Sequence, residues 1–176
     1  MRGVGVDTVE IGAFAASLAE PGTRFTSAFS ATERRQCRDR AEERGVARGA
    51  GVVGALDADG ARAADGAARS AGAPDALSSS PDPDGVARHL AGRWAVKEAV
   101  VKAWSAALYG QPPPIAPDLL RWIEIETVCD AWGRPAVRLG GQVAQQVAAS
   151  VGESAAWHVS LSHDGDAAVA FVVLEA

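Results

Sequence analysis

Apolar and polar residues alternate in several short stretches of the chain, and a two-residue repeat of this kind is typical of β-strands with one buried face. The alternation predicts strands over residues 2–7, 122–129, 135–139, 157–163 and 167–174. A turn at Asp130-Ala-Trp-Gly133 joins the second strand to the third, and Asp164-Gly165 joins the last two. We therefore expect antiparallel hairpins.

The first predicted strand ends in a carboxylate. Val4 and Val6 fall on one face of this strand, whereas Gly3, Gly5 and Asp7 fall on the other. Because Asp7 is the last residue of the alternating stretch, we expect its side chain to leave the core at the end of the strand.

A helical repeat separates the strands, with apolar residues three and four positions apart. It predicts helices over residues 11–19, 30–44, 85–108 and 140–151. The third helix is the longest, and it carries Trp94 and Trp104 on one side and Val96 and Val100 on the next, so it should be largely buried. The expected fold is α+β, a single domain with an antiparallel sheet packed on this long helix.

Residues 45–83 interrupt this pattern with a composition dominated by Ala, Gly, Asp, Ser and Pro. They contain few large apolar side chains, and burial of these would not offset the entropy lost on ordering the segment. We expect a long low-complexity insertion within the domain.

The composition limits the partners and the location. The chain has 176 residues and a formal net charge of -5, which argues against nucleic acid or an anionic membrane as the main partner. Its first residues are interrupted by Asp7 and Glu10, so we expect neither a signal peptide nor a membrane span. Cys37 and Cys129 have no zinc-site spacing, and a cytoplasmic protein with free thiols is the simplest interpretation.

The helix that begins at the Ser30-Ala-Thr-Glu33 capping box is unusually basic for this acidic chain. It carries Arg34, Arg35, Arg38, Arg40 and Arg44. Two interpretations remain open: a solvated helix with i,i+4 ion pairs, or a surface that binds another molecule.

The long helix contains a charge pair that packing does not explain. Glu98 and Lys102 are i,i+4 neighbours in an apolar helix, flanked by the small residues Ala95 and Ser105. An acidic group in such a helix is costly unless it is paired, hydrogen-bonded or bound to a metal. Taken alone, the pair is explained by a partly exposed salt bridge, and Asp7 by a helix cap.

Three segments taken together favour a different explanation. They are Gly3-Val-Gly-Val-Asp7-Thr-Val-Glu-Ile11, Trp94-Ala-Val-Lys-Glu98-Ala-Val-Val-Lys102-Ala103 and Ser160-Leu-Ser-His163. In this order they resemble the signatures of phosphopantetheinyl transferases of the holo-[acyl-carrier-protein] synthase type. The resemblance extends to Arg24-Phe25, Leu90-Ala-Gly-Arg93 and Gly133-Arg-Pro135, and it covers most of the chain outside the insertion.

The resemblance implies magnesium-dependent transfer of 4′-phosphopantetheine from coenzyme A to a serine of an apo acyl carrier protein, for fatty acid or polyketide synthesis. Asp7 and Glu98 would bind the Mg²⁺ ion, which typically takes one or two protein carboxylates together with phosphate oxygens and water. Glu98, or a water on the metal, would accept the serine proton. Lys102 would stabilise or protonate the departing 3′,5′-ADP phosphate.

The resemblance also implies a set of coenzyme A contacts. His163 would contact a phosphate, with Ser162 beside it, and Gly133-Arg134-Pro135 would form the loop on the adenine side. Lys97 either reaches a phosphate or extends its charge to solvent past the apolar stripe.

A compact member of this family would assemble its site between subunits, so the resemblance implies a homotrimer. Each site would combine Asp7, Glu98 and Lys102 of one protomer with His163 and Ser162 of its neighbour. Where the family often places a basic side chain to dock the acidic carrier protein, this chain has Gly12–Ala16, and Arg24 with the 34–44 helix is a candidate replacement.

Two functions from other classes compete with this interpretation. Gly3-Val-Gly5 begins like the glycine-rich loop of a dinucleotide-binding oxidoreductase, but Thr8 replaces the third glycine and no βαβ order follows. A non-catalytic module that binds coenzyme A or a carrier protein would be expected to lack the metal ligands, and both carboxylates are present.

Overall fold

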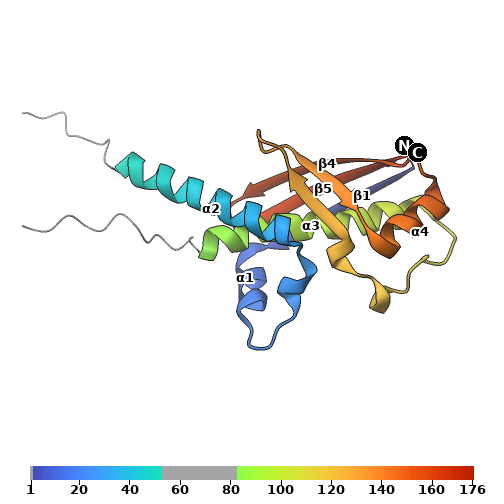
Figure 1. Ribbon diagram of the computed structural model, residues 1–176, viewed down its shortest axis with the longest axis horizontal. Helices are drawn as coiled ribbons and strands as arrows, with labels where there is room; N and C mark the ends of the chain where they lie inside the picture. The colour runs from blue at the N-terminus through green and yellow to red at the C-terminus, as the bar shows by residue number, and fades with distance from the viewer. Residues whose placement is uncertain (1, 53–82) are drawn as a thin grey trace, which may run out of the picture.

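The computed structural model describes residues 2–52 and 83–176, and it has the expected α+β architecture (Figure 1). The strands are β1 (Gly3–Glu10), β2 (Ile125–Cys129), β3 (Pro135–Leu139), β4 (Ala156–Asp164) and β5 (Ala167–Glu175). The helices are α1 (Ile11–Ala19), α2 (Ala31–Val52), α3 (Pro83–Ala107) and α4 (Gly141–Val151). Short 3₁₀ turns cover η1 (Phe25–Ala28), η2 (Pro117–Leu119) and η3 (Trp122–Glu124).

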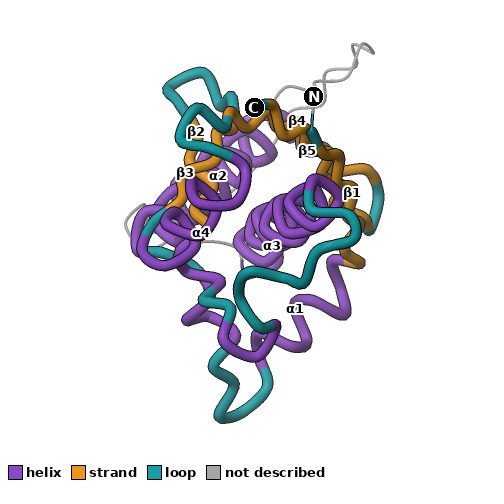
Figure 2. Tube along the Cα trace, turned by 90° about the vertical axis from the view of Figure 1, so that its right-hand side faces the viewer, coloured by secondary structure: helices purple, strands orange, loops and turns teal. Residues whose placement is uncertain are grey.

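The strands form two antiparallel sheets, one of order β1-β5-β4 and a hairpin of β2 and β3. The first strand therefore pairs with the last, and Asp7 lies opposite Ala170. Figure 2 shows α3 close to end-on, with the larger sheet on one side and the β2–β3 hairpin and α4 on the other. The long helix is the centre of the molecule.

Enclosure on several sides explains the burial of α3. Its apolar side chains are almost completely covered, including Val96, Val100 and Trp104. Trp94 is partly exposed. Its ring packs edge-on against Phe25 and at a tilt against Trp122, at ring separations of 4.6 and 4.8 Å. The prediction of a largely buried long helix is confirmed.

The contact between β1 and α3 leaves no space for side chains. A Cβ atom on Gly3 would lie 2.0 Å from the Ala103 carbonyl oxygen, and one on Gly5 would lie 1.9 Å from that of Ala99. Asp7 shares this face of β1 and is buried against the helix, so the prediction that it leaves the core is wrong. Val4 and Val6 face outward instead.

The second helix begins as predicted and ends later. In its capping box the Glu33 amide donates to Ser30 Oγ at 3.0 Å, and the Ser30 amide donates to Glu33 Oε2 at 2.8 Å. The helix continues to Val52, so the irregular segment does not start at residue 45, and α3 already begins at Pro83. The rest of the predicted insertion, residues 53–82, lies outside the described residues. None of the helices in the described ranges is long and apolar enough to cross a membrane.

Candidate active site

Asp7 and Lys102 meet where the edge strand β1 crosses α3. The Lys102 ammonium donates to Asp7 Oδ1 at 2.6 Å and to the Val6 carbonyl at 3.1 Å. The Asp7 side chain is almost fully buried, whereas that of Lys102 is 54% exposed. The hydrogen bond to Asp7 raises the pKa of Lys102, so this amine stays cationic at neutral pH.

Glu98 lies one helical turn before Lys102 and faces the same carboxylate. Burial, followed by the neighbouring Asp7, raises the pKa of Glu98 to about 7, while Lys102 opposes the shift. Within the described residues no ion pair joins Glu98 directly to Lys102, because Lys102 pairs with Asp7. The simple i,i+4 salt bridge considered from the sequence is therefore wrong.

The two carboxylates fit part of a magnesium site. Asp7 Oδ2 is buried and has no hydrogen-bond partner among the described residues, so one ligand oxygen is free. No cluster of three or more His, Cys, Asp or Glu side chains that could hold a metal occurs in the described ranges. Asp7 and Glu98 would thus leave coordination positions for substrate phosphate and water, as magnesium prefers.

A second group of predicted residues lines a cavity of about 310 Å³ between α2, α3, the β2–β3 turn and β4. Gly133, Pro135 and His163 border it. Its walls also carry basic and aromatic side chains that sequence reasoning did not assign to a ligand, namely Arg40, Arg44, His89, Arg93 and Trp132. The lining also includes Glu43, which pairs with Arg40 at 3.4 Å, and the three arginines still leave the site basic, in an acidic protein.

Two side-chain nitrogens of residues that line this cavity are buried without a hydrogen-bond partner among the described residues. They are the donor Nε of Arg93, which is 3% exposed, and the ring nitrogen Nε2 of His89, which is 7% exposed. Burial, followed by the charge of His163, lowers the pKa of His89 to about 4, so His89 is neutral at physiological pH. Buried donors are normally satisfied, so an anion in the cavity would complete the Arg93 donor. His89 also lines the cavity, and its inert role stays a prediction.

His163 packs edge-on against His89 at a ring separation of 5.8 Å. Its Nε2 atom lies 2.9 Å from the Arg88 carbonyl oxygen, which can only accept, so Nε2 carries a hydrogen. Burial lowers the pKa of His163, and the hydrogen bond to Arg88 opposes this. Ser162 precedes His163 on β4. Its side chain therefore faces the opposite, exposed side of the sheet rather than this cavity.

Two predicted coenzyme A contacts are directed elsewhere. The Arg134 guanidinium lies 2.6 Å from Asp130 Oδ2 and 4.9 Å from the Trp132 ring, outside the lining of the cavity. Lys97 is completely buried and forms a 3.0 Å ion pair with Glu33, so it reaches neither a phosphate nor solvent. Both alternatives considered for Lys97 are wrong, because a buried carboxylate on α2 binds the ammonium.

Within one protomer the two groups of residues lie apart. Asp7 is on β1 and His163 is on β4, at opposite edges of the three-stranded sheet with β5 between them. The cavity bordered by His163 includes none of Asp7, Glu98 and Lys102. The two groups of predicted residues therefore lie in separate places on this chain.

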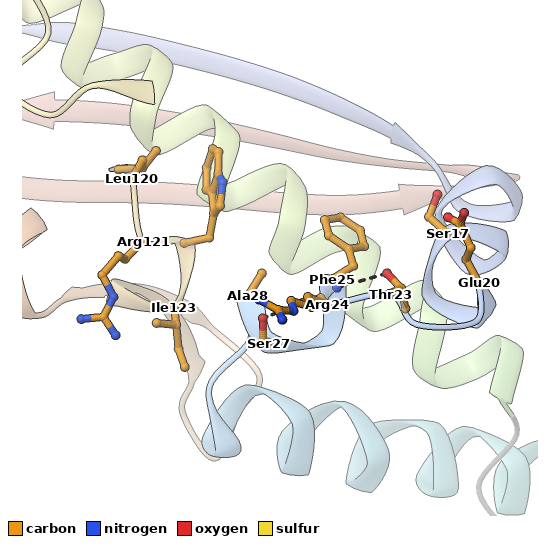
Figure 3. Close-up of a pocket in the computed structure, with 11 residues that line it drawn as sticks. Ser17, Glu20, Thr23, Arg24, Phe25, Ser27, Ala28, Leu120, Arg121 and Ile123 are labelled. Carbon is orange, nitrogen blue, oxygen red and sulfur yellow. Dashed lines mark hydrogen bonds between the residues drawn. The ribbon is translucent and has the colours of Figure 1, made fainter. Parts of the chain in front are cut away.

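A separate groove of about 850 Å³ opens between η1 and η3. Figure 3 shows Phe25 and Ala28 beside Arg24 on one wall, with Leu120, Arg121 and Ile123 on the other. Arg121 is already paired with Glu124 at 2.9 Å, whereas Arg24 is exposed. The groove combines apolar side chains with the positive charges of Arg24 and Arg121 and the negative charge of Glu20.

Comparison with known proteins agrees with this fold. Residues 56–172 match the family model described as the 4′-phosphopantetheinyl transferase superfamily. The holo-[acyl-carrier-protein] synthase of Corynebacterium glutamicum is 40% identical over 99% of this chain and 98% of its own length. The Mycobacterium tuberculosis holo-[acyl-carrier-protein] synthase is 38% identical over 99% and 96%. A solved structure described as a Chronobacterium ammoniagenes ACPS–CoA complex has a TM-score of 0.70 and 38% identity, and the match covers 98% of this chain and 96% of the other.

The α+β fold and the paired carboxylates thus define a phosphopantetheinyl transferase, and the chain belongs to the 4′-phosphopantetheinyl transferase superfamily. Within that superfamily its family is that of the holo-[acyl-carrier-protein] synthases.

Proposed function

We propose that this chain transfers 4′-phosphopantetheine from coenzyme A to a serine of an apo acyl carrier protein, releasing 3′,5′-ADP. The observation that carries the proposal is the meeting of Asp7, Glu98 and Lys102 at the crossing of β1 and α3. These side chains are what phosphoryl transfer requires: oxygen ligands for a cation, a base, and a fixed positive charge.

Asp7 and Glu98 would hold a Mg²⁺ ion, which when bound neutralises charge on the coenzyme A pyrophosphate. Glu98 accepts the proton of the serine hydroxyl while the serine oxygen bonds to the β-phosphorus. The bond from that phosphorus to the bridging oxygen breaks. Lys102 stabilises the charge that develops on the 3′,5′-ADP phosphate.

The basic cavity supports a role in binding the nucleotide of coenzyme A. Arg40, Arg44, Arg93 and His163 supply positive charge or donors for its phosphates, and Trp132, which is 80% exposed, offers a face on which adenine can stack. The Gly133–Pro135 turn would shape the adenine side of this cavity, with Arg134 held outside it by Asp130.

A homotrimer would join the two groups of residues, so that each is a half-site. One half-site holds Asp7, Glu98 and Lys102, and the other is the cavity bordered by His163. The outer face of the larger sheet exposes Val4, Val6, Val169 and Phe171, each between 37% and 48% exposed, and such an apolar patch favours association. A cyclic arrangement would bring the β4 edge of one protomer, with His163 and Ser162, to the β1 edge of the next. Three such contacts give three sites.

The groove in Figure 3 is the proposed docking surface for the carrier protein. Its exposed Arg24 suits an acidic partner, and its apolar side chains suit the apolar face of a helix. The basic helix supports this only in part, because Arg34 donates to the Phe29 carbonyl at 2.8 Å, while Arg40 and Arg44 line the nucleotide cavity. We also propose a cytoplasmic location, which fits the free thiols of Cys37 and Cys129.

The experiment is to incubate the chain with an apo acyl carrier protein and measure the mass of the intact carrier. A gain of one phosphopantetheine is expected only when both Mg²⁺ and coenzyme A are present. Asp7→Ala and Glu98→Ala should each lower turnover by at least about a hundred-fold with the fold kept, and Lys102→Ala should lower kcat more than it weakens coenzyme A binding. Undiminished transfer in excess chelator, or a parent-like rate for Glu98→Ala, would contradict the proposal.

A further inference from the structure

Lys97 is completely buried, yet every hydrogen of its ammonium group has an acceptor. The group donates to Glu33 Oε2 at 3.0 Å, to the Trp122 carbonyl at 3.1 Å, and to the Ile125 carbonyl. A lysine ammonium has three donors, so this one is saturated. The position and direction of the Lys97 side chain are therefore fixed.

The partner carboxylate is fixed equally well. Besides the bond from Lys97, Glu33 Oε2 accepts the Ser30 amide at 2.8 Å, and Oε1 accepts the Thr127 amide at 3.0 Å. Glu33 has no exposed surface. The pair therefore ties the start of α2, the middle of α3 and the strand β2 to a single point.

Stability alone does not explain a charged pair at this position. Replacing a buried ion pair with apolar side chains of similar volume is often neutral or stabilising. Apolar contacts have no preferred direction, whereas hydrogen bonds do. A lysine that donates three hydrogen bonds therefore fixes the rotation of α3 about its axis. Successive helical residues lie about 100° apart, so a side chain held at Lys97 determines where Glu98 points.

Glu98 needs such a constraint because it faces Asp7. Two carboxylates repel each other, and the repulsion acts before any cation is bound. On the sheet side the Gly5–Ala99 contact limits how closely α3 approaches β1, while Lys97 holds the helix from another direction. We propose that Lys97 and Glu33 are positioning residues, which hold Glu98 beside Asp7 so that the metal ligands are in place before the ion binds. This inference rests on the proposed metal role of Asp7 and Glu98.

The test is the double variant Glu33→Gln/Lys97→Met, which removes both charges and roughly conserves volume. Its unfolding midpoint should stay within about 5 °C of the parent, and its dissociation constant for coenzyme A without metal within about two-fold. Among the described residues the pair does not line the cavity bordered by His163, and its hydrogen bonds go to β2 rather than to the β1-β5-β4 sheet. In contrast, kcat should fall by about ten-fold or more. Binding of Mn²⁺ in the presence of coenzyme A, followed by electron paramagnetic resonance of the free ion, should weaken by about five-fold or more.

A matched control separates positioning from simple destabilisation. Val147→Ala removes a buried side chain on α4, away from the pair, and should lower the unfolding midpoint while kcat and Mn²⁺ binding per folded molecule stay at parent values. If the double variant does not fold, the single isostere Glu33→Gln is judged by the same two readouts. Parent values of kcat and Mn²⁺ binding in whichever variant folds would overturn the positioning role. If the parent itself bound no more Mn²⁺ than Asp7→Asn does, the proposed metal role would fail instead.

Discussion

The protonation of His163 determines whether this residue can donate a hydrogen bond to a phosphate. Its Nε2 hydrogen is already used on the Arg88 carbonyl, so in the neutral ring the other nitrogen, Nδ1, is an acceptor. A phosphate oxygen is also an acceptor, so contact with it requires the imidazolium. Since burial lowers the pKa of His163 in the free protein, the phosphate must raise that pKa when it binds.

Coenzyme A binding should therefore take up a proton and weaken as pH rises. Between pH 6 and 8 the dissociation constant of the parent should rise with pH more steeply than that of His163→Gln. The difference between the two should be up to about ten-fold per pH unit. Titration calorimetry in two buffers of different ionisation enthalpy measures the proton uptake directly. Equal slopes for the parent and the variant would mean that His163 does not contact the phosphate as a cation.

Glu98 should lower the stability of the protein that it serves. Its folded pKa of about 7 lies above the ordinary 4.5, so stability contributed by its protonated form is lost as pH rises from about 4.5 to 7. The carboxyl is partly exposed, and solvent screening leaves a cost of about 1 kcal/mol.

Glu98→Gln removes this cost. In the absence of metal the variant should be about 1 kcal/mol more stable than the parent at pH 8, with little difference at pH 5, although it is inactive. Urea unfolding at the two pH values measures this. A variant less stable than the parent at pH 8 would show that the Glu98 carboxylate is stabilised in the fold.

At the level of elements, the cavity bordered by His163 depends on how closely β4 approaches α3. A Cβ atom on Gly92 would lie 2.7 Å from His163 Nε2 and 2.9 Å from Leu161 Cδ1. Gly92 therefore allows His163 to reach the Arg88 carbonyl. A larger residue in this turn of α3 would displace the histidine.

We expect Gly92→Ala to weaken coenzyme A binding by about five- to ten-fold, because it moves His163 out of its hydrogen bond. The matched control is Gly45→Ala in α2, where nothing lies within 4 Å of the new atom, and its affinity should be that of the parent. Fluorescence or calorimetric titration with coenzyme A compares the two. Equal affinities would remove the proposed link between helix packing and the cavity.

The sequence predicts most elements well, and its errors have physical causes. The boundaries of α1 match those expected, and Glu10 caps the helix by accepting the Gly12 amide at 2.9 Å. The facing of β1 was predicted wrongly, because alternation alone does not say which face is buried when one face consists of glycines. Contact with backbone carbonyls of α3 decides it, and that contact is long-range.

At the scale of the whole molecule, the predicted site residues fall into two separate groups. Asp7, Glu98 and Lys102 come together as expected from their motifs, and Gly133, Pro135 and His163 border one cavity. The ion pair between Lys97 and Glu33 was missed, since the capping box accounted for Glu33 by local contacts and left no reason to look for a distant partner. Pairing across 64 residues has no signature in the sequence.

If the site is shared between protomers, two inactive variants should restore each other. Glu98→Ala lacks one half-site and His163→Ala lacks the other, so random assortment in mixed trimers leaves about a quarter of the sites with both halves intact. The two variants are refolded together and assayed by the mass of the carrier protein. Activity no higher than that of either variant alone, or sedimentation of an active monomer, would exclude a shared site.

The close contact between β1 and α3 has a consequence for how faithfully the chain folds. A slip of one residue in the pairing of β1 with β5 would turn Val4 and Val6 toward the carbonyls of α3, where not even a Cβ atom fits. A misaligned first strand is thus sterically prevented from closing. Because β1 pairs with β5, the contact with α3 checks a pairing between strands that lie at opposite ends of the element order.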